Sequence, residues 1–471
     1  MKNISIWNNY LTDKSNNQEI ANNINTDILI IGAGITGLTT AFFLKDTNYK
    51  ITVIDKDKIG NGTTAKTTAK ISYIEQDIYQ KLTRMHGSRI AKKYYESKKD
   101  AITLLNKIIN DNNIECDKQL VQSILFTNDK KNINKLITEK NILSSYKENP
   151  KKYQDNHIKY GFSVFNTYTF NPIKYLMSLK NIVKSKTTIY ENTIAKSIKK
   201  DNNNYIVLTN NGIINTKKIV LACHYPFFII PYFFPLRTYI EREYVSVAKI
   251  NNPQNKTFIN IDKSLYSVRY YKNYLIYGSF DHRLTSKIDY GKNLKKHQSD
   301  FIKYFNVKPE YTWINQDIVS NDKLPIIGKI KENIYISTAY NAWGMTSATI
   351  GAKIIADLIQ NKDNKYITLF NPRRINIPLI INSIIGIFHY LKAYFESLFH
   401  KSNPHYVKIK GFLYGVYLDK NGIEHKVKLL CPHMKCSLVF NKEEKTWNCP
   451  CHGSRFDLDG NIICSPAVKK I

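Results

Sequence analysis

Asp27-Ile28-Leu29-Ile30-Ile31-Gly32-Ala33-Gly34-Ile35-Thr36-Gly37 is the stretch that decides the fold of most of the chain. Its apolar run predicts a buried parallel strand, and the residues that follow predict a helix. Gly32 allows a tight turn, Gly34 lets a pyrophosphate approach the backbone, and Gly37 lets helix and strand pack closely. A second apolar strand ends at Asp55, where a carboxylate can bind ribose hydroxyls. Together these features predict a dinucleotide-binding unit rather than a fortuitous glycine-rich turn.

A second nucleotide-binding segment is predicted far downstream. A strand over 334–338 is followed by the turn Gly344-Met345-Thr346 and a helix over 347–359. A fingerprint close to the N-terminus with a second segment so distant favours FAD over NAD. The arrangement resembles the D-amino-acid-oxidase and glycine-oxidase superfamily. In that superfamily the turn opens a helix whose N-terminus faces the flavin and stabilises negative charge on the reduced ring. Relatives usually carry Gly where Ala339 stands.

The stretch 62–70 is rich in hydroxyl groups and contains two lysines. The resemblance implies that Thr63, Thr64 and Lys70 contact the pyrophosphate or the isoalloxazine edge of FAD. The alternative is a solvated loop without ligand contacts. Residues 219–227 resemble the strand that returns to the flavin domain in this superfamily.

The last part of the chain carries two loops that each combine a Cys with a nearby His. Cys431 lies two residues before His433, and Cys449 lies three residues before His452. A Rieske [2Fe–2S] cluster binds two Cys on one iron and two His on the other, so each loop would give one ligand to each iron. A structural zinc site with Cys₃His or Cys₂His₂ ligands is the alternative. Zinc would not need the Gly-Ser-x-aromatic run that follows the last His.

These loops resemble those of the Rieske proteins in respiratory and photosynthetic quinol-oxidising complexes. The resemblance implies that Cys436 and Cys451 form a disulfide between the loops, and that Ser465-Pro466-Ala467 shields the cluster. Lys435 and Ser465 stand where that family usually has Gly, which permits some loop conformations at little cost.

Two further positions concern the reduction potential of the cluster. Ser454 matches a family hydroxyl that donates to a cluster sulfur, but Phe456 stands where high-potential members have Tyr. Hydrogen bonds to sulfur tune the potential. We therefore predict a potential below that of the quinol-oxidising type.

The motifs predict an α/β fold class: an FAD-binding Rossmann-like domain with an interleaved α+β substrate domain, and a small C-terminal all-β Rieske domain. Residues 1–370 would form the FAD-dependent oxidoreductase, and residues 405–471 the Rieske domain. Flavin segments are expected at about 24–80, 170–225 and 325–365, and the substrate domain at about 81–169 and 226–324. Within the substrate domain we expect helices from 85 to 148 and an antiparallel sheet from 228 to 322.

Residues 371–404 are expected to form an amphipathic helical linker. Its apolar residues recur on one helical face: Ile380, Ile381, Ile384, Ile385, Phe388, Leu391, Phe395 and Leu398. We expect this face to dock on the flavoprotein. The alternative is an interfacial helix that touches a membrane through 379–400, whereas Asn382 and Gly386 argue against a span.

Composition sets further limits. The chain has 69 Lys and Arg against 38 Asp and Glu, a net charge of +31. The basic residues are scattered, and Lys, Asn, Ile and Tyr share AT-rich codons, so we expect no nucleic-acid partner. Five of the seven cysteines lie in the tail, which indicates cofactor binding rather than a secreted disulfide framework. No apolar signal-peptide region and no stretch of roughly 20 apolar residues is visible, so the cytoplasm is the expected location.

The whole chain resembles bacterial flavoproteins that fuse an amine- or amino-acid-oxidising FAD domain to a C-terminal Rieske domain. This implies a dehydrogenase for a small amine or amino-acid-like molecule. Electrons would pass from flavin to cluster and on to an external acceptor, a carrier protein or a quinone. The alternative is a redox sensor or electron-transfer protein, or a reductase that runs in the opposite direction. Candidate substrate-binding or catalytic residues are Arg237, Arg242, Tyr244, Arg269, His282 and Trp343. An Arg would bind a substrate carboxylate in bidentate fashion, although each of these side chains has a structural role as its alternative.

Overall fold

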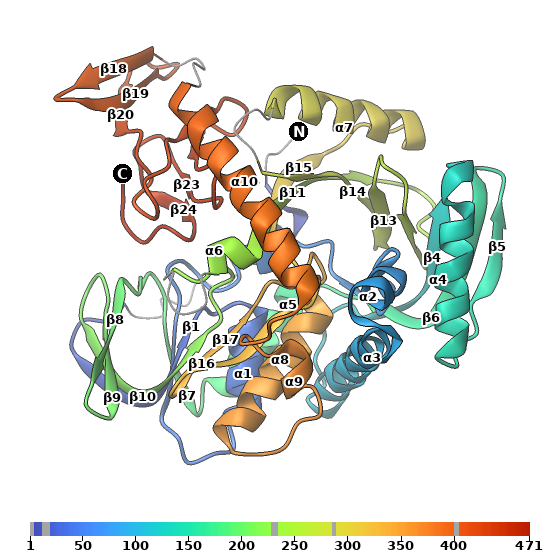
Figure 1. The fold of residues 1–471 in the computed structure, drawn as a ribbon, viewed down its shortest axis with the longest axis horizontal. Helices are drawn as coiled ribbons and strands as arrows, with labels where there is room; N and C mark the ends of the chain where they lie inside the picture. Colours follow the sequence, from blue (N-terminus) through green and yellow to red (C-terminus); the bar gives the residue numbers. More distant parts are fainter. Residues whose placement is uncertain (1–3, 12–18, 228–233, 285–288, 400–404) are drawn as a thin grey trace.

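The computed structural model of the chain describes residues 4–11, 19–227, 234–284, 289–399 and 405–471 (Figure 1). The dinucleotide fingerprint lies in a mostly parallel sheet. In sheet order its strands are β16 (Ile326–Lys331), β17 (Ile334–Thr338), β10 (Ile213–Leu221), β1 (Ile24–Ile31), β2 (Ile51–Ile54) and β7 (Thr187–Tyr190). The antiparallel strands β8 (Ser197–Asp201) and β9 (Asn204–Leu208) extend from β10.

The parallel pairing follows from strands that are apolar on both faces. Ile30 of β1 lies between Val220 of β10 and Val53 of β2, and all three side chains are fully buried. Helices cover the sheet: α1 (Ile35–Leu44) packs against both α5 (Pro172–Val183) and α8 (Gly344–Ile359). Since parallel strands end at the same edge, β1 and β2 bring Gly32 and Asp55 together there.

A second sheet lies in the part of the chain that is predicted to be the substrate domain. In sheet order its strands are β15 (Tyr311–Ser320), β11 (Thr238–Lys249), β14 (Tyr274–Arg283), β13 (Tyr266–Tyr271), β12 (Lys256–Asn260), β4 (Gln119–Thr127), β6 (Ile158–Thr169) and β3 (Lys70–Ile71), with β5 (Lys151–Asp155) paired to β6. Its helices are α2 (Ile78–His86), α3 (Ser88–Asp111), α4 (Ile133–Ser145) and α7 (Tyr290–Phe305). The short elements of the chain are η1 (Ile6–Tyr10), η2 (Thr63–Lys66), η3 (Lys130–Asn132), α6 (Phe234–Arg237) and α9 (Ile367–Phe370).

One detail of the expected substrate domain was wrong, because β4 interrupts the expected helical segment 85–148 and pairs with β6 and β12. The expected antiparallel sheet over 228–322 is present, since the strands β11 to β15 pair with one another in antiparallel fashion. A parallel pairing of β12 with β4 joins this sheet to the earlier part of the chain. Residues 228–233, at the start of the expected sheet, lie outside the described part of the chain.

The C-terminal region is made of two small antiparallel sheets beside one end of the flavoprotein (Figure 1). The first contains β18 (His405–Ile409), β19 (Phe412–Leu418) and β20 (Glu424–Lys428). The second contains β21 (Val439–Asn441), β22 (Thr446–Asn448), β23 (Arg455–Phe456) and β24 (Ile462–Cys464). A separate apolar core around Trp447 and Phe456 holds this region together.

The linker is a single long helix, α10 (Ile377–Phe399), which crosses the near face of the molecule in Figure 1. The prediction that its apolar face docks on the flavoprotein was wrong, because Phe388 is 67% exposed and the other described residues of that face are exposed as well. Leu379 and Ala393, on the opposite side, are the buried positions. Residues 400–404 of the expected linker and the side chain of Leu398 lie outside the described part.

The length and composition of α10 also differ from expectation. The segment Ile377–Glu396 is long and apolar enough to cross a membrane, with a mean hydropathy of 1.3 in a window that is 17% buried. The prediction that no stretch reaches this length and apolarity was therefore wrong. Length and composition alone do not distinguish a spanning helix from one that lies on a surface.

Candidate active site and cluster site

Two glycines of the fingerprint, Gly32 and Gly37, lie where the backbone leaves no room for a Cβ. Gly32 has φ +112°, and a Cβ there would collide with the carbonyl group of Ala222 on the neighbouring strand. A Cβ on Gly37 would collide with the carbonyl oxygen of Gly32. The close turn and the close contact between helix and strand therefore both require glycine.

The acid at the end of β2 is held by backbone donors. The Ala33 N–H donates to Oδ2 of Asp55 at 2.7 Å, and the Asp57 N–H donates to Oδ1 at 3.1 Å. Burial raises the pKa of Asp55 to about 6, against the effect of these two donors. The side chain lines the cavity described next, where the sequence predicts the ribose.

A cavity with an empty volume of about 1730 Å³ lies at the edge where β1 and β2 end. Most of the predicted FAD-binding residues line it: Gly32, Gly34, Asp55, Thr63, Thr64, Gly344 and Met345. Gly37 lies behind the turn, and the hydroxyl of Thr346 lies 3.5 Å from the ammonium of buried Lys98. The Ile35 N–H, at the start of α1, donates to the Thr64 hydroxyl at 3.2 Å. Both residues line the cavity, so the N-terminus of α1 lies at its wall. A helix N-terminus of this kind favours phosphate groups.

A smaller cavity of about 590 Å³ shares Thr67, Ala342, Gly344 and Met345 with the larger one. Trp343 and Lys70, both predicted site residues, line it. Glu243 and Asp281 line it as well, from the central strands β11 and β14. This cavity therefore adjoins the larger one and is bordered by the second sheet.

The charged groups of the smaller cavity perturb one another. The Lys70 ammonium donates to Thr68 at 3.0 Å and to Ser267 at 2.9 Å. Burial lowers the pKa of Lys70 to about 8, although the carboxylate of Glu243 opposes this. Burial raises the pKa of Glu243 to about 7, and Lys70 opposes that shift. Asp317 lines the larger cavity, and burial followed by repulsion from Glu243 raises its pKa to about 7.

The three candidate arginines donate hydrogen bonds to other groups of the protein. Arg237 donates to the carbonyl groups of Pro372 and Arg374. Arg242 is buried and donates to Gln316 and to the Tyr290 hydroxyl. Arg269 is buried and donates to the carbonyl groups of Thr68, Ala69, Phe170 and Tyr270. None of the three lines either cavity.

Two other candidates also lie away from the cavities. The imidazole of His282 stacks on the ring of Tyr244, with centroids 5.8 Å apart. Neither residue lines the two cavities. Among the described residues, Trp343 is thus the one predicted substrate contact that the structure brings into the site.

The two tail loops bring their Cys and His residues together. Cys431 and Cys449 are buried, with their sulfurs within hydrogen-bonding distance of each other. The rings of His433 and His452 lie edge-on to each other, with centroids 5.1 Å apart and an angle of 87° between their planes. Both ring nitrogens of His433 and Nδ1 of His452 are buried without a hydrogen-bond partner in the described structure. Burial lowers the pKa of His433 to about 4, so the ring is neutral, the state in which it binds metal. Two thiols and two neutral imidazoles with unsatisfied nitrogens fit the ligand set of a Rieske cluster.

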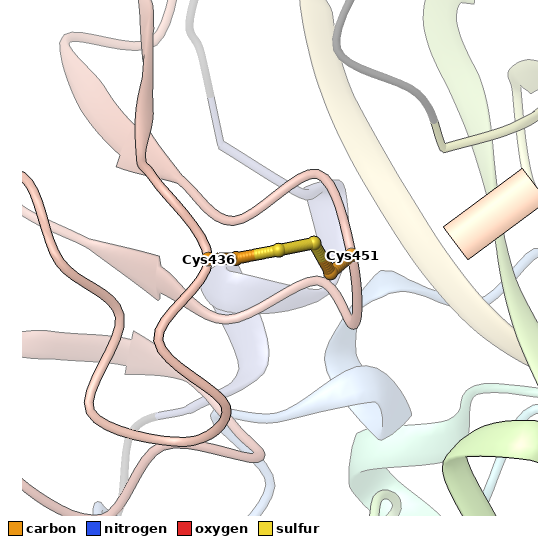
Figure 2. The surroundings of a disulfide bond; sticks show 2 residues. All are labelled: Cys436 and Cys451. Carbon is orange, nitrogen blue, oxygen red and sulfur yellow. A yellow bond between two sulfur atoms is a disulfide. The ribbon is translucent and has the colours of Figure 1, made fainter. Parts of the chain in front are cut away.

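Cys436 and Cys451 form a disulfide that joins the two loops (Figure 2). The sulfur of Cys449 lies within 4.8 Å of both, but a disulfide sulfur is not a thiolate ligand. Lys435, which stands where the Rieske family usually has Gly, adopts φ +59°, so a residue with a side chain occupies the left-handed region there. Ser465, the other position where the family usually has Gly, has no positive φ, so the serine causes no such backbone strain.

The cluster domain closes one side of the larger cavity. Its residues Arg455, Ile462, Ile463, Cys464, Ser465, Ala467 and Val468 line that cavity together with the fingerprint. Nε2 of Gln316 donates to the Gly453 carbonyl at 3.1 Å and approaches the Cys464 sulfur at 3.5 Å. The Lys56 ammonium donates to the Ile463 carbonyl at 2.8 Å. Flavin site and cluster domain are thus in direct contact.

Several residues of the site were missed from the sequence. Glu243, Asp281, Asp317 and Gln316 were not among the predicted site residues. A signal was present, because the central strand β11 carries Glu241, Arg242 and Glu243 in succession. Charges on both faces of a central strand are unusual, and they indicate that one face borders a site.

Comparisons with known proteins agree with this geometry. The model of the FAD dependent oxidoreductase family (DAO) matches residues 27–358, and that of the Rieske [2Fe-2S] domain matches residues 390–471. YhfW of Bacillus subtilis (strain 168), whose name describes a Rieske 2Fe-2S iron-sulfur protein, is 30% identical over 475 residues, covering 94% of this chain and 92% of YhfW. A crystal structure of glycine oxidase from Geobacillus kaustophilus superposes with a TM-score of 0.63 at 13% identity, over 75% of this chain and 100% of the oxidase. A crystal structure of L-proline dehydrogenase from P. horikoshii superposes with a TM-score of 0.61 at 18% identity, over 74% of this chain and 97% of the dehydrogenase.

These matches confirm the predicted α/β fold class with its β-rich C-terminal Rieske domain. They also confirm the two predicted cofactors, FAD and a [2Fe–2S] cluster, and decide against the zinc alternative. The residue-by-residue ligand assignment remains a prediction that the buried, unpartnered imidazole nitrogens support.

Proposed function

This chain belongs to the FAD dependent oxidoreductases, and from that premise we propose that it oxidises a small amine or amino-acid-like molecule and delivers the electrons through its Rieske centre to an external acceptor. One observation carries the proposal. The larger cavity is bounded by the fingerprint on one side and by residues 462–465 of the Rieske domain on another. The smaller cavity opens from the same turn at Ala342. A substrate chamber, a flavin site and a cluster domain therefore adjoin one another.

The two cofactors suit a dehydrogenase. Bound FAD supplies a hydride acceptor, and a Rieske cluster supplies one-electron transfer, so together they link a two-electron oxidation to a one-electron acceptor. Direct reaction with oxygen would need no cluster.

The charges of the smaller cavity support an amine as substrate. Glu243, whose pKa burial raises to about 7, presents a carboxylate to it above that pH, and a carboxylate in a poorly solvated cavity attracts an ammonium strongly. Burial and the charge of Glu243 raise the pKa of Asp281 well above its usual value, so Asp281 adds a neutral carboxyl group to the same wall. Lys70 is the lone cationic side chain among the described residues that line it. A substrate carboxylate would therefore be bound by Lys70 and not by an arginine pair.

The remaining wall suits the reacting end of the substrate. Trp343 lines the smaller cavity immediately before α8, and Gly344 begins that helix at the boundary of the two cavities. The N-terminal amides of α8 favour negative charge at this boundary. Glycine oxidase and L-proline dehydrogenase, which share the fold, are named for substrates with an oxidisable C–N bond.

We infer that the acceptor is a carrier protein or a quinone, because either takes electrons singly. The cytoplasmic location stays a prediction from the sequence.

The test is anaerobic mixing of the purified holoprotein with a panel of amines and amino acids, read as loss of flavin absorbance. We expect at least one amine to bleach the flavin. In the Glu243→Gln variant, a higher concentration of that amine should be needed for the same loss of flavin absorbance. Phe165→Tyr, at an exposed position of β6, is the matched control and should behave as wild type. Bleaching by a reduced carrier protein alone would favour the redox-sensor or reductase alternative.

A further inference from the structure

The outer face of α10 is apolar and open to solvent. We define it by Ile380, Ile381, Ile384, Ile385, Phe388 and Leu391, which are between 41% and 67% exposed. Their spacing places them on one continuous stripe along about three helical turns. Soluble monomers rarely expose a contiguous apolar patch of this kind, so the stripe indicates an interaction site.

The inner face of the same helix is anchored to the protein. The Asn382 side chain donates to the Asn321 carbonyl at 3.0 Å, and the Asn321 side chain donates to Ser383 at 3.1 Å. Further along, the ring of Tyr390 lies 5.1 Å from that of His452. A helix held to both domains in this way lies along the surface, so its outer face is presented without the helix crossing a bilayer.

We propose that the outer face of α10 binds the surface of an anionic lipid bilayer. Amphipathic helices with an apolar face and few charges enter the boundary between headgroups and acyl chains to a depth of about 5–10 Å. The described part of α10 carries just Lys392 and Glu396 as charged residues. The chain's net charge of +31 adds attraction to anionic lipids.

The same charge argues against a second copy of this chain as the occupant. Two chains of +31 repel each other across a face that offers no acidic patch in its described residues. Binding to a bilayer would also bring the helix that contacts His452 to the lipid surface, and this consequence is independent of the substrate that the enzyme oxidises.

The test is flotation of the holoprotein with phosphatidylcholine vesicles that contain or lack phosphatidylglycerol. We expect wild type to float with the anionic vesicles, less so at high salt, and Phe388→Glu/Leu391→Glu to stay in the soluble fraction. The bilayer would bury the side chains of Phe388 and Leu391, so their loss should weaken the affinity for vesicles by on the order of a hundredfold or more. Leu120→Glu/Phe165→Glu removes two exposed apolar residues elsewhere, which are 56% and 52% exposed, and this variant should float as wild type.

Flavin absorbance shows that each variant is folded, and Phe388→Ser/Leu391→Ser replaces the charged pair if that variant loses flavin. Equal flotation of wild type and the α10 variant would overturn the proposal, as would a wild type that stays soluble with both vesicles. A wild-type dimer that the α10 substitutions convert to a monomer, measured by light scattering without lipid, would assign the face to a second copy instead.

Discussion

The ring of Tyr225 lies edge-on to the imidazole of His433, with centroids 6.3 Å apart. The same ring lies 6.4 Å from the imidazole of His452. The two residues before it, Cys223 and His224, line the larger cavity. A single short segment after β10 therefore borders the larger cavity at one end and contacts both predicted histidine ligands at the other.

Tyr225 is buried, so replacing it changes the medium between the two cofactor sites. We expect Tyr225→Leu to slow the appearance of the reduced-cluster EPR signal after anaerobic flavin reduction, because an aromatic ring is lost from the segment that joins the larger cavity to the two histidines. Tyr225→Phe keeps the ring and should retain most of the rate. Rapid-freeze EPR measures both. Equal rates in Leu and Phe variants that hold full cofactor would contradict a role for the ring.

The binding of a cationic amine should depend on pH through Glu243, whose pKa burial raises to about 7. Below that pH the carboxyl is neutral, and above it the anion attracts the ammonium, so affinity should rise with pH by about tenfold. Lys70 loses its charge above about 8 and acts in the same direction, and Asp281 also faces the cavity. Titration of flavin absorbance with the amine at several pH values measures the effect.

Glu243→Gln should flatten the rise that is centred near pH 7, because an amide does not titrate there. Lys70→Met should move that rise to higher pH, because Lys70 holds down the pKa of Glu243, and it should remove the contribution of Lys70 itself. Affinity that falls with rising pH in the wild type would contradict an ammonium ligand at this cavity.

The sequence predicted best what is encoded within short stretches. The glycine turn and the Cys/His loops depend on spacings of a few residues, so both cofactors followed from local pattern. The contact of Gln316 with Gly453 joins residues 137 apart, and no local pattern predicts it. The prediction that the outer face of α10 docks on the flavoprotein was wrong for a different reason. Periodicity identifies an apolar face but does not say whether protein, lipid or water covers it.

The reduction potential of the cluster should respond to hydroxyl groups near its cysteines. The Ser454 hydroxyl hydrogen-bonds to the Cys431 sulfur and accepts from the Ala467 N–H at 3.0 Å. We expect Ser454→Ala to lower the potential and Phe456→Tyr to raise it, because donors to sulfur favour the more negative reduced cluster. Protein-film voltammetry measures both shifts. An unchanged or lowered potential in Phe456→Tyr would refute the explanation based on its missing hydroxyl.

Ala339 adopts φ +58°, in the left-handed region that strains a residue with a Cβ. Relief of about 1–2 kcal/mol of strain outweighs the flexibility that glycine adds to the unfolded chain. Ala339→Gly should therefore stabilise the flavin domain by about 1 kcal/mol in thermal unfolding. Ala348→Gly, inside helix α8, is the control and should destabilise by about 1 kcal/mol. Destabilisation by Ala339→Gly would show that its backbone is not strained.

Asp322 and Arg374 form a buried ion pair ahead of α10. Nε of Arg374 donates to Asp322 at 2.6 Å, and Asn376 donates to the same carboxylate at 3.1 Å. Burial alone would raise the pKa of Asp322, but the charge and hydrogen bonds of Arg374 outweigh it and lower the pKa to about 2. A folded-state pKa below the unfolded value of about 3.9 stabilises the protein above that pH, and the contribution of about 2 kcal/mol is lost as pH falls towards 2.

Arg374→Met leaves the Asp322 carboxylate buried without its cation, and it should cost about 3–5 kcal/mol at neutral pH in urea unfolding. Since the same substitution removes the depressed pKa, the variant should lose less stability than wild type between pH 4 and pH 2. Lys200→Met breaks the exposed pair with Glu332 and serves as the control, with an unfolding midpoint close to that of wild type. If Arg374→Met and Lys200→Met shifted the midpoint equally, the buried pair would not anchor the start of α10. The orientation of the outer face would then depend on the Asn321, Asn382 and Ser383 contacts and on the contact of Tyr390 with His452.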